Sequence, residues 1–143
     1  MKHKIAFIGK LPKKRTDFKK QGRINRRKGS EFERNVRRDL ESQGWIVIKN
    51  PNNVREGKFA FAKPKFNPFT KSLMMNSSGF PDFVCFQNLD DLSKIIVVEC
   101  KSNGYLSKEE KEKCVWLLKN KVFLTILIAS KDGKGIKYRE FEK

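Results

Sequence analysis

An almost unbroken run of apolar residues, Val122 to Ala129, is the feature that most restricts how this chain can fold. A strand that is apolar on both faces must be covered from both sides, as a central strand is in a layered α/β fold. Shorter runs that read as strands are 45–48, 83–86, 95–101 and, as an edge strand, 136–141. The sequence therefore predicts an α/β sandwich with a central mixed β-sheet flanked by helices.

Two helices are predicted from their starting signals. Ser30 and Glu33 have the spacing of a capping box, in which the serine and the acid satisfy free backbone amides at the helix start. Apolar residues at helical spacing follow, and Gly44 is expected to end this helix. The same capping pattern predicts a second helix from Ser107 to about Lys119.

The charge of the chain predicts a polyanionic partner. The 143 residues include 33 Lys and Arg against 16 Asp and Glu, which gives a net charge of +17. Such an excess on a small domain is typical of nucleic-acid binding. Residues 1–28 contain a single acid, Asp17, and are expected to be a flexible basic arm that contacts phosphates, with residues 29–143 forming the folded domain.

Membrane insertion and a cysteine framework are not expected. No apolar run approaches the roughly 20 residues of a spanning helix, so we expect an intracellular, cytoplasmic protein. The three cysteines are odd in number and lack CxxC spacing, and His3 is the single histidine. These counts argue against a disulfide scaffold and a Cys/His zinc site.

Residues 50–79 form a long segment in which Pro and Phe alternate with Lys and Arg. A connection of this length inside one domain is usually functional or has structure of its own. Its aromatic and basic residues suit contact with nucleic acid, including a wedge into a distorted duplex. The alternative, left open by the sequence, is that the phenylalanines cover one end of the core or a subunit interface.

Two short signatures carry the chemistry: Pro81-Asp82 and Glu99-Cys100-Lys101. Side chains alternate along a strand, so Glu99 and Lys101 are expected on one face. Two carboxylates beside a lysine suit Mg²⁺-assisted phosphodiester hydrolysis, with the Cys100 carbonyl as a further oxygen ligand. Lys101 would orient the attacking water and stabilise developing negative charge. Taken singly, Asp82 also fits a turn, and Glu99 with Lys101 also fits a surface ion pair.

These signatures resemble a known family. Gly79–Asp82 followed by Val97–Lys101 resembles the PD-(D/E)xK nuclease motif of the restriction-endonuclease-like fold. The segment Lys28–Arg34 resembles the opening of archaeal Holliday-junction resolvases, where the acidic residue belongs to the active site. The resemblance implies a catalytic set of Glu33, Asp82, Glu99 and Lys101, with metal ligands Glu33, Asp82, Glu99 and Cys100.

The resemblance also implies a cofactor, partners and further contacts. It implies Mg²⁺, with Mn²⁺ as a substitute, and a homodimer in which each subunit cuts one strand of a four-way junction. The residues expected to contact DNA are Arg26, Arg27, Lys28, Ser30, Arg34 and Ser78. The chain differs from the compact resolvases in its longer segment before Pro81, and in lacking a glutamine early in the second helix.

The function expected from the sequence is therefore a Mg²⁺-dependent, structure-selective DNA endonuclease of recombination and repair. Two alternatives are left open. One is a restriction- or repair-type nuclease of the same fold, of the kind that viruses and mobile elements carry. The other is a basic nucleic-acid-binding module without catalysis, like a ribosomal protein, although such a module gives no reason for Asp82, Glu99 and Lys101 to converge.

Overall fold

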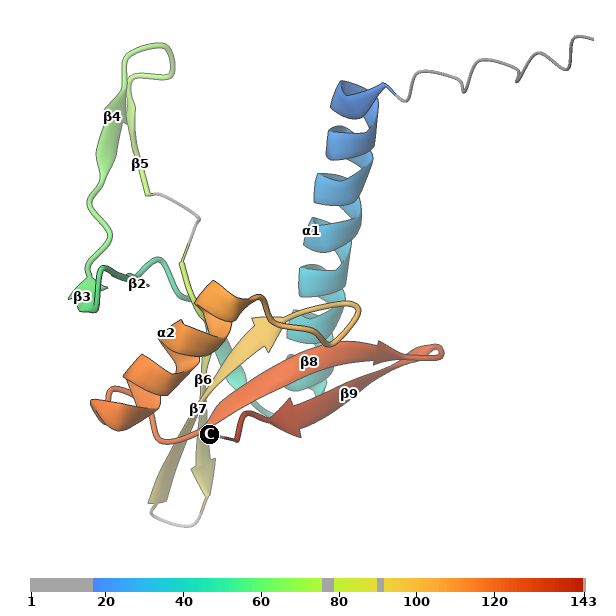
Figure 1. Ribbon diagram of the computed structural model, residues 1–143, viewed down its shortest axis with the longest axis vertical. Coiled ribbons are helices and arrows are strands. Elements are labelled where there is room, and N and C mark those ends of the chain that lie inside the picture. The colour runs from blue at the N-terminus through green and yellow to red at the C-terminus, as the bar shows by residue number, and fades with distance from the viewer. Residues whose placement is uncertain (1–16, 76–78, 90–91, 143) are drawn as a thin grey trace, which may run out of the picture.

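The computed structural model describes residues 17–75, 79–89 and 92–142. A five-stranded sheet in the order β1-β6-β7-β8-β9 lies between two helices, which confirms the predicted α/β class (Figure 1). Its strands are β1 (Ile46–Lys49), β6 (Phe83–Leu89), β7 (Leu92–Cys100), β8 (Ile126–Asp132) and β9 (Gly135–Glu140). The two helices are α1 (Phe18–Ser42) and α2 (Lys108–Lys119).

The sheet is mixed, as predicted. Strand pairs β1–β6, β6–β7 and β8–β9 are antiparallel, whereas β7 and β8 run parallel. Parallel neighbours need a crossover connection, and α2 supplies it between β7 and β8. Strand β9 lies at one edge of the sheet, where the sequence predicted an edge strand.

The alternation of side chains along β6 and β7 divides the core into two layers. The layer under α1 contains Phe32, Val36, Leu40, Val47, Phe83, Cys85, Ile96, Val98 and Ala129. The layer under α2 contains Val54, Phe80, Val97, Leu106, Cys114, Leu117, Ile126 and Ile128. Consecutive residues of β7 thus point to opposite layers, and this fixes which face the residues after it occupy.

The start predicted for the first helix is wrong, because α1 begins twelve residues before Ser30. Asp17 is the N-cap residue, and its Oδ1 accepts hydrogen bonds from the backbone amides of Lys19 (3.1 Å) and Lys20 (3.2 Å). The Lys, Arg and Gln residues that follow are good helix formers. Residues 18–28 are therefore helix rather than a flexible arm, while residues 1–16 lie outside the described part of the chain.

The second helix has the predicted start and end. The Ser107 side chain and that of Glu110 form the expected capping box. The strand expected from Val122 starts only at Ile126, and Leu124 is 80% exposed in the connection before it. In the described part of the chain, neither helix is long and apolar enough to cross a membrane.

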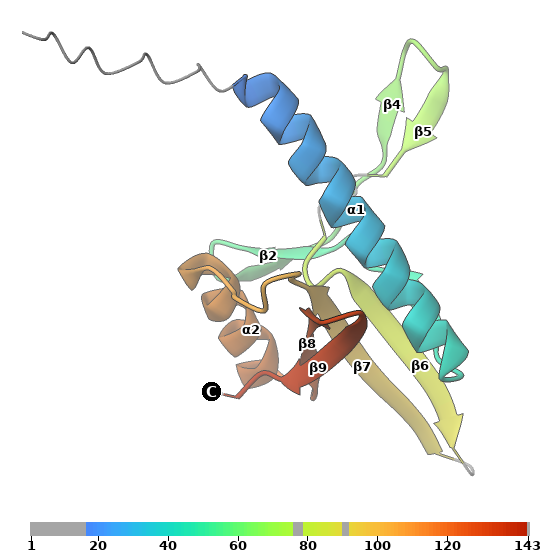
Figure 2. The same cartoon turned by 90° about the vertical axis from the view of Figure 1, so that its right-hand side faces the viewer.

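Residues 50–79 contain two small hairpins instead of an irregular loop. Strands β2 (Asn53–Arg55) and β3 (Lys58–Ala60) form the first, which places Val54 in the core layer under α2. Strands β4 (Lys65–Asn67) and β5 (Ser72–Met74) form the second. In Figures 1 and 2 the β4–β5 hairpin and the N-terminal half of α1 both project beyond the same end of the sheet and diverge from each other.

Candidate active site

Two acidic residues meet where β6 begins and β7 ends. The register pairs Phe83 with Val98, so Asp82, just before β6, arrives beside Glu99. The Asp82 N–H donates to Glu99 Oε2 (3.1 Å), and the Cys100 N–H donates to Asp82 Oδ2 (2.8 Å). Each carboxylate is thus held by the backbone next to the other, and Glu99 is only 4% exposed.

Lys101 completes this cluster, as the strand alternation predicted. Its Nζ lies 3.2 Å from Glu99 Oε1 and also donates to Glu110 Oε1. Glu110 is held in turn by the capping box, since its Oε2 accepts from the Ser107 N–H (2.8 Å). Burial acts to lower the pKa of Lys101, but the hydrogen bond to Glu110 and the charge of Glu99 outweigh it and raise the pKa. Lys101 is therefore an ammonium that contacts the carboxyl group of Glu99 and the carboxylate of Glu110.

Glu33 reaches the same end of the sheet from α1. It lies inside the helix rather than in a capping box, and its Oε2 accepts from Lys49 Nζ at the end of β1 (2.7 Å). The charge of Glu33 contributes to raising the pKa of Asp82, but Glu33, Asp82 and Glu99, all among the described residues, do not gather into a group that could hold one metal ion. A hollow of about 210 Å³ opens here, lined by Ser30, Glu33, Arg34, Arg37, Lys49 and Phe83.

The two central carboxyl groups are destabilised as anions. Burial raises the pKa of Glu99 to about 8, with a further contribution from the charge of Asp82, while Lys101 opposes both. Burial also raises the pKa of Asp82; the Cys100 N–H partly offsets this, and the charge of Glu33 adds to it. Lys49 and Lys101 offset the burial of these two acids only in part, and a bound cation would relieve the remainder.

The donor atoms fit Mg²⁺ better than a metal that requires a closed cage. Among residues 17–75, 79–89 and 92–142, no group of three His, Cys, Asp or Glu side chains is gathered to hold a metal. Mg²⁺ usually takes one or two carboxylates and completes its shell with water and phosphate oxygens. Asp82 is only partly buried, and its Oδ2 accepts from the Cys100 N–H (2.8 Å), so this carboxylate is within reach of solvent.

The residues predicted to contact DNA lie mostly along one face of α1. At 100° per residue, Arg26, Ser30 and Arg34 share a stripe that leads to Glu33, and Arg27 lies at its border. Lys28 falls on the other side of the helix, and Ser78 lies outside the described residues. Lys19 and Arg23, which the sequence reasoning did not single out as DNA contacts, extend the stripe toward the start of the helix.

Two residues of the site were missed by the sequence reasoning. Lys49 gave no local signal, because its contact with Glu33 depends on how β1 packs beside α1. Glu110 was seen only as part of a capping box, whereas its other carboxylate oxygen contacts Lys101. The lack of a glutamine early in α2 could have drawn attention to Glu110, which lies in the same stretch of the helix.

The cysteine side chains do not take part in this chemistry. All three are free thiols, and Cys85 and Cys114 are buried. Burial raises the pKa of both of these thiols to about 12, so they stay protonated near neutral pH. Burial and the charge of Asp82 raise the pKa of the Cys100 thiol as well.

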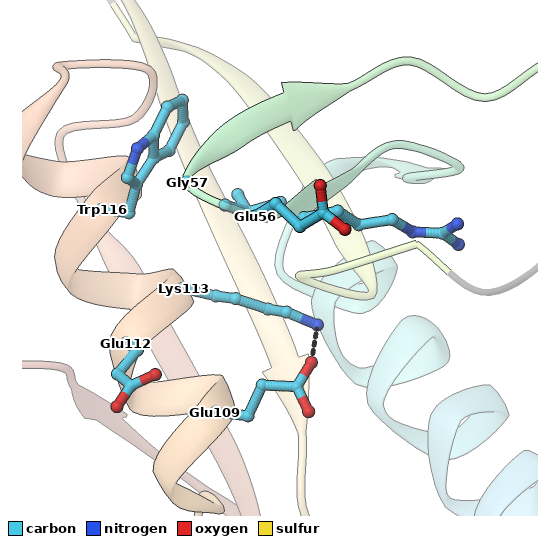
Figure 3. A pocket seen from close by; sticks show the side chains of 8 residues that line it. Glu56, Gly57, Glu109, Glu112, Lys113 and Trp116 are labelled. Carbon is cyan, nitrogen blue, oxygen red and sulfur yellow. Dashed lines mark ion pairs between the residues drawn. The ribbon is translucent and has the colours of Figure 1, made fainter.

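A larger cavity of about 480 Å³ lies elsewhere, between α2 and the β2–β3 turn (Figure 3). Trp116 and Lys113 line it from α2, and Lys113 forms an ion pair with Glu109 (2.7 Å). None of the predicted catalytic residues lines this cavity, whose wall mixes the acids Glu56, Glu109 and Glu112 with the bases Arg55 and Lys113.

Comparisons with protein-family models, curated proteins and solved structures found no match to this chain. The functional interpretation therefore depends on the residues of the site and on their geometry.

Proposed function

We propose that this protein is a Mg²⁺-dependent endonuclease that hydrolyses phosphodiester bonds in branched DNA, most like the archaeal Holliday-junction resolvases. The observation that carries the proposal is the meeting of Asp82, Glu99 and Lys101 at one end of the sheet. A surface ion pair would be exposed, whereas Glu99 is 4% exposed and has a pKa of about 8. Such a strained acid is more typical of a functional site than of a stabilising contact.

Each residue has a role in this proposal. Asp82 and Glu99 would hold Mg²⁺, with the Cys100 carbonyl as a backbone ligand and Glu33 at the margin of the site. The ion would supply charge neutralisation at the phosphate and a more acidic water. Lys101 stays protonated, so it orients a water or a phosphate oxygen by donating hydrogen bonds and does not act as a base. Glu110 positions Lys101.

The finer fold assignment belongs to the same proposal. A restriction-endonuclease-like core is supported by a mixed sheet whose β6 start and β7 end carry the Asp82 and Glu99-x-Lys101 elements. Both differences from the compact resolvases have a structural counterpart. The extra length before Pro81 forms the β2–β3 and β4–β5 hairpins, and Glu110 contacts Lys101 from the helix that lacks the glutamine.

The DNA backbone is proposed to follow the stripe on α1. Residues 18–29 carry Lys19, Lys20, Arg23, Arg26, Arg27 and Lys28 and no acid. Positive charge in the first turn of a helix opposes the helix dipole, and basic residues three or four positions apart repel one another, so these residues reduce the stability of α1. The presence of these basic residues is explained if DNA phosphates neutralise their charges. From Lys19 to Arg37 the stripe is about 27 Å long at 1.5 Å per residue, which is enough to follow several phosphates.

Neutralising Arg26 and Arg27 together, as Arg26→Gln and Arg27→Gln, is expected to weaken DNA binding and flatten its salt dependence. The slope of log Kd against log salt should fall by about 0.9 for each phosphate that the variant no longer neutralises. Fluorescence anisotropy at several salt concentrations measures it. Lys28→Gln is the matched control because Lys28 lies on the other side of α1, and an equal effect there would contradict a DNA path along the stripe.

The proposed homodimer has a candidate surface on the sheet. Ile46 (66% exposed) and Ile95 (49%) flank Phe86 in one row of the register, and Ile48 (52%) lies in the next pleat on the same face. We expect Ile46→Lys with Ile95→Lys to reduce the sedimenting mass from dimer to monomer. Leu124→Lys, at a comparably exposed apolar position off this patch, is the control. An unchanged mass in the double variant would exclude this surface as the dimer contact.

The proposed activity is tested with the full chain on labelled four-way junctions, flaps, single strands and linear duplex, in Mg²⁺, Mn²⁺ or EDTA. We expect cleavage of junctions with either metal and none in EDTA. Cleavage of linear duplex at a defined sequence would instead favour a restriction- or repair-type nuclease. Binding of these DNAs without cleavage in either metal would reject the nuclease and favour a binding module.

A further inference from the structure

The β4–β5 hairpin exposes more apolar surface than its size explains. Phe69 at its turn is 95% exposed, and the cross-strand pair Phe66 (63%) and Leu73 (71%) lies on one face of the ribbon. Both views show the hairpin standing off from the sheet (Figures 1 and 2). These side chains add nothing to the described core, so a binding partner is the economical explanation for them.

The turn holds Phe69 in position by its own hydrogen bonds. Asn67 Oδ1 accepts from the Phe69 N–H (2.9 Å), and the hydroxyl groups of Thr70 and Ser72 lie 2.7 Å apart. A hollow of about 380 Å³ lies beside the turn, and it is lined by Lys65, Phe66, Asn67, Pro68, Phe69, Met74 and Met75. The ring is thus presented outward from an ordered turn, next to an apolar hollow.

The charge around the hairpin selects the kind of partner. Residues 57–75 contain Lys58, Lys63, Lys65 and Lys71 and no Asp or Glu. A second copy of this surface would bring like charges together, on a chain whose net charge is already +17. A partner that is negatively charged and also offers flat apolar faces fits both properties, and nucleic acid with unstacked bases is such a partner.

The location of the hairpin favours branched DNA over intact duplex. The hairpin and the basic half of α1 both project beyond the same end of the sheet and diverge from each other (Figures 1 and 2). DNA that follows the stripe on α1 would therefore extend beyond the end of the sheet where the hairpin stands. In an intact duplex the base faces are covered by their neighbours, whereas at a branch point a base can unstack and expose its face to an aromatic ring.

We propose that Phe69 and Phe66 form a base-stacking surface that recognises unstacked bases at DNA branch points, with the hairpin lysines contacting the adjacent phosphates. The inference rests on the proposed function for its choice of DNA as partner, but it does not depend on catalysis. It assigns to this hairpin the discrimination between branched and linear DNA, and leaves bond cleavage to Asp82 and Glu99.

The test measures binding in EDTA, where no cleavage is expected. The full chain is titrated into a four-way junction and a linear duplex of matching sequence, each with 2-aminopurine at the position that is the branch point in the junction. Phe66→Ala with Phe69→Ala should weaken junction binding roughly 10- to 100-fold, as expected for the loss of base–aromatic stacking. Duplex affinity should change less than about 2-fold, because phosphate contacts carry it.

Two control variants sharpen this test. Phe69→Trp keeps an aromatic face and should retain both junction affinity and the change in 2-aminopurine emission on binding. Leu124→Ala removes an equally exposed apolar side chain away from the hairpin and should have no effect. Equal losses on junction and duplex, or a Trp variant as weak as the Ala variant, would overturn base stacking.

Two further outcomes separate this proposal from the others. If the double Ala variant sediments at half the mass of the unmodified chain and 2-aminopurine emission never responds, the hairpin is a contact between copies and the stacking proposal fails. If the unmodified chain binds junctions with the expected emission change but does not cut them in Mg²⁺, the nuclease fails and the stacking surface stands.

Discussion

Asp82→Asn and Glu99→Gln are each expected to reduce junction cleavage by about 10²- to 10⁴-fold, the usual cost of removing a charged catalytic group. Both substitutions keep the size of the side chain, replace one acceptor oxygen by an NH2 group and remove one negative charge. Junction affinity in EDTA should stay within about 3-fold, because the phosphate contacts are assigned to α1 and to the hairpin. Single-turnover cleavage at saturating DNA separates the chemical step from binding.

The same two substitutions should make the folded protein more stable in EDTA. Burial and mutual repulsion disfavour the ionised forms of Asp82 and Glu99, so a neutral side chain removes a cost of folding. Activity and stability thus move in opposite directions, as expected for a strained functional site. If these acids served only to hold the start of β6 against the end of β7 by hydrogen bonds, the variants would unfold more easily and cleavage would be unaffected.

Glu109→Gln is the matched control for these variants. Glu109 lies one residue before Glu110 in α2, and its carboxylate pairs with Lys113 instead of Lys101. The substitution removes the same charge from the same helix without touching the carboxylate cluster. It should leave cleavage unchanged, and a comparable loss of cleavage would mean that overall charge, not the site, governs the rate.

The central part of the site was predictable because its geometry is local. Alternation along β7 alone places Glu99 and Lys101 on one face, and the structure has them 3.2 Å apart. The approach of Asp82 required only that β6 and β7 pair across a short turn, which neighbouring strands in a chain usually do. Local periodicity and short connections thus made most of the sheet and the Asp82–Glu99–Lys101 cluster predictable from the sequence.

The sequence-based predictions were wrong or incomplete where two local signals competed, or where packing between distant segments determined the structure. Ser30 and Glu33 satisfy a capping pattern, yet Asp17 caps the helix because the intervening residues favour helix strongly enough to continue it. The pairing of Glu33 with Lys49 joins α1 to the end of β1 and has no sequence signature. The hairpins of residues 53–74 lie in a segment whose mixed composition carries little periodicity.

The stability of the metal-free protein is expected to depend on pH through Glu99. Its pKa is about 8 in the folded chain and about 4.5 when unfolded, so the folded state binds the extra proton. The corresponding stabilisation is complete below pH 4.5 and is lost as the pH rises to about 8, by on the order of a few kcal/mol. Urea unfolding in EDTA across this range, compared with Glu99→Gln, isolates this contribution because the variant lacks it.

Mg²⁺ should reverse that loss, which makes the metal site measurable without any cleavage. A cation on Asp82 and Glu99 favours their ionised forms, so Mg²⁺ competes with the proton and stabilises the fold more at pH 8 than at pH 5. At 100 times its Kd a ligand that binds only the folded state adds about 2.7 kcal/mol. Glu109→Gln should respond like the unmodified chain, and Glu99→Gln should respond weakly. An equal Mg²⁺ increment in Glu99→Gln, or one that matches KCl at the same ionic strength, would show that Glu99 holds no metal.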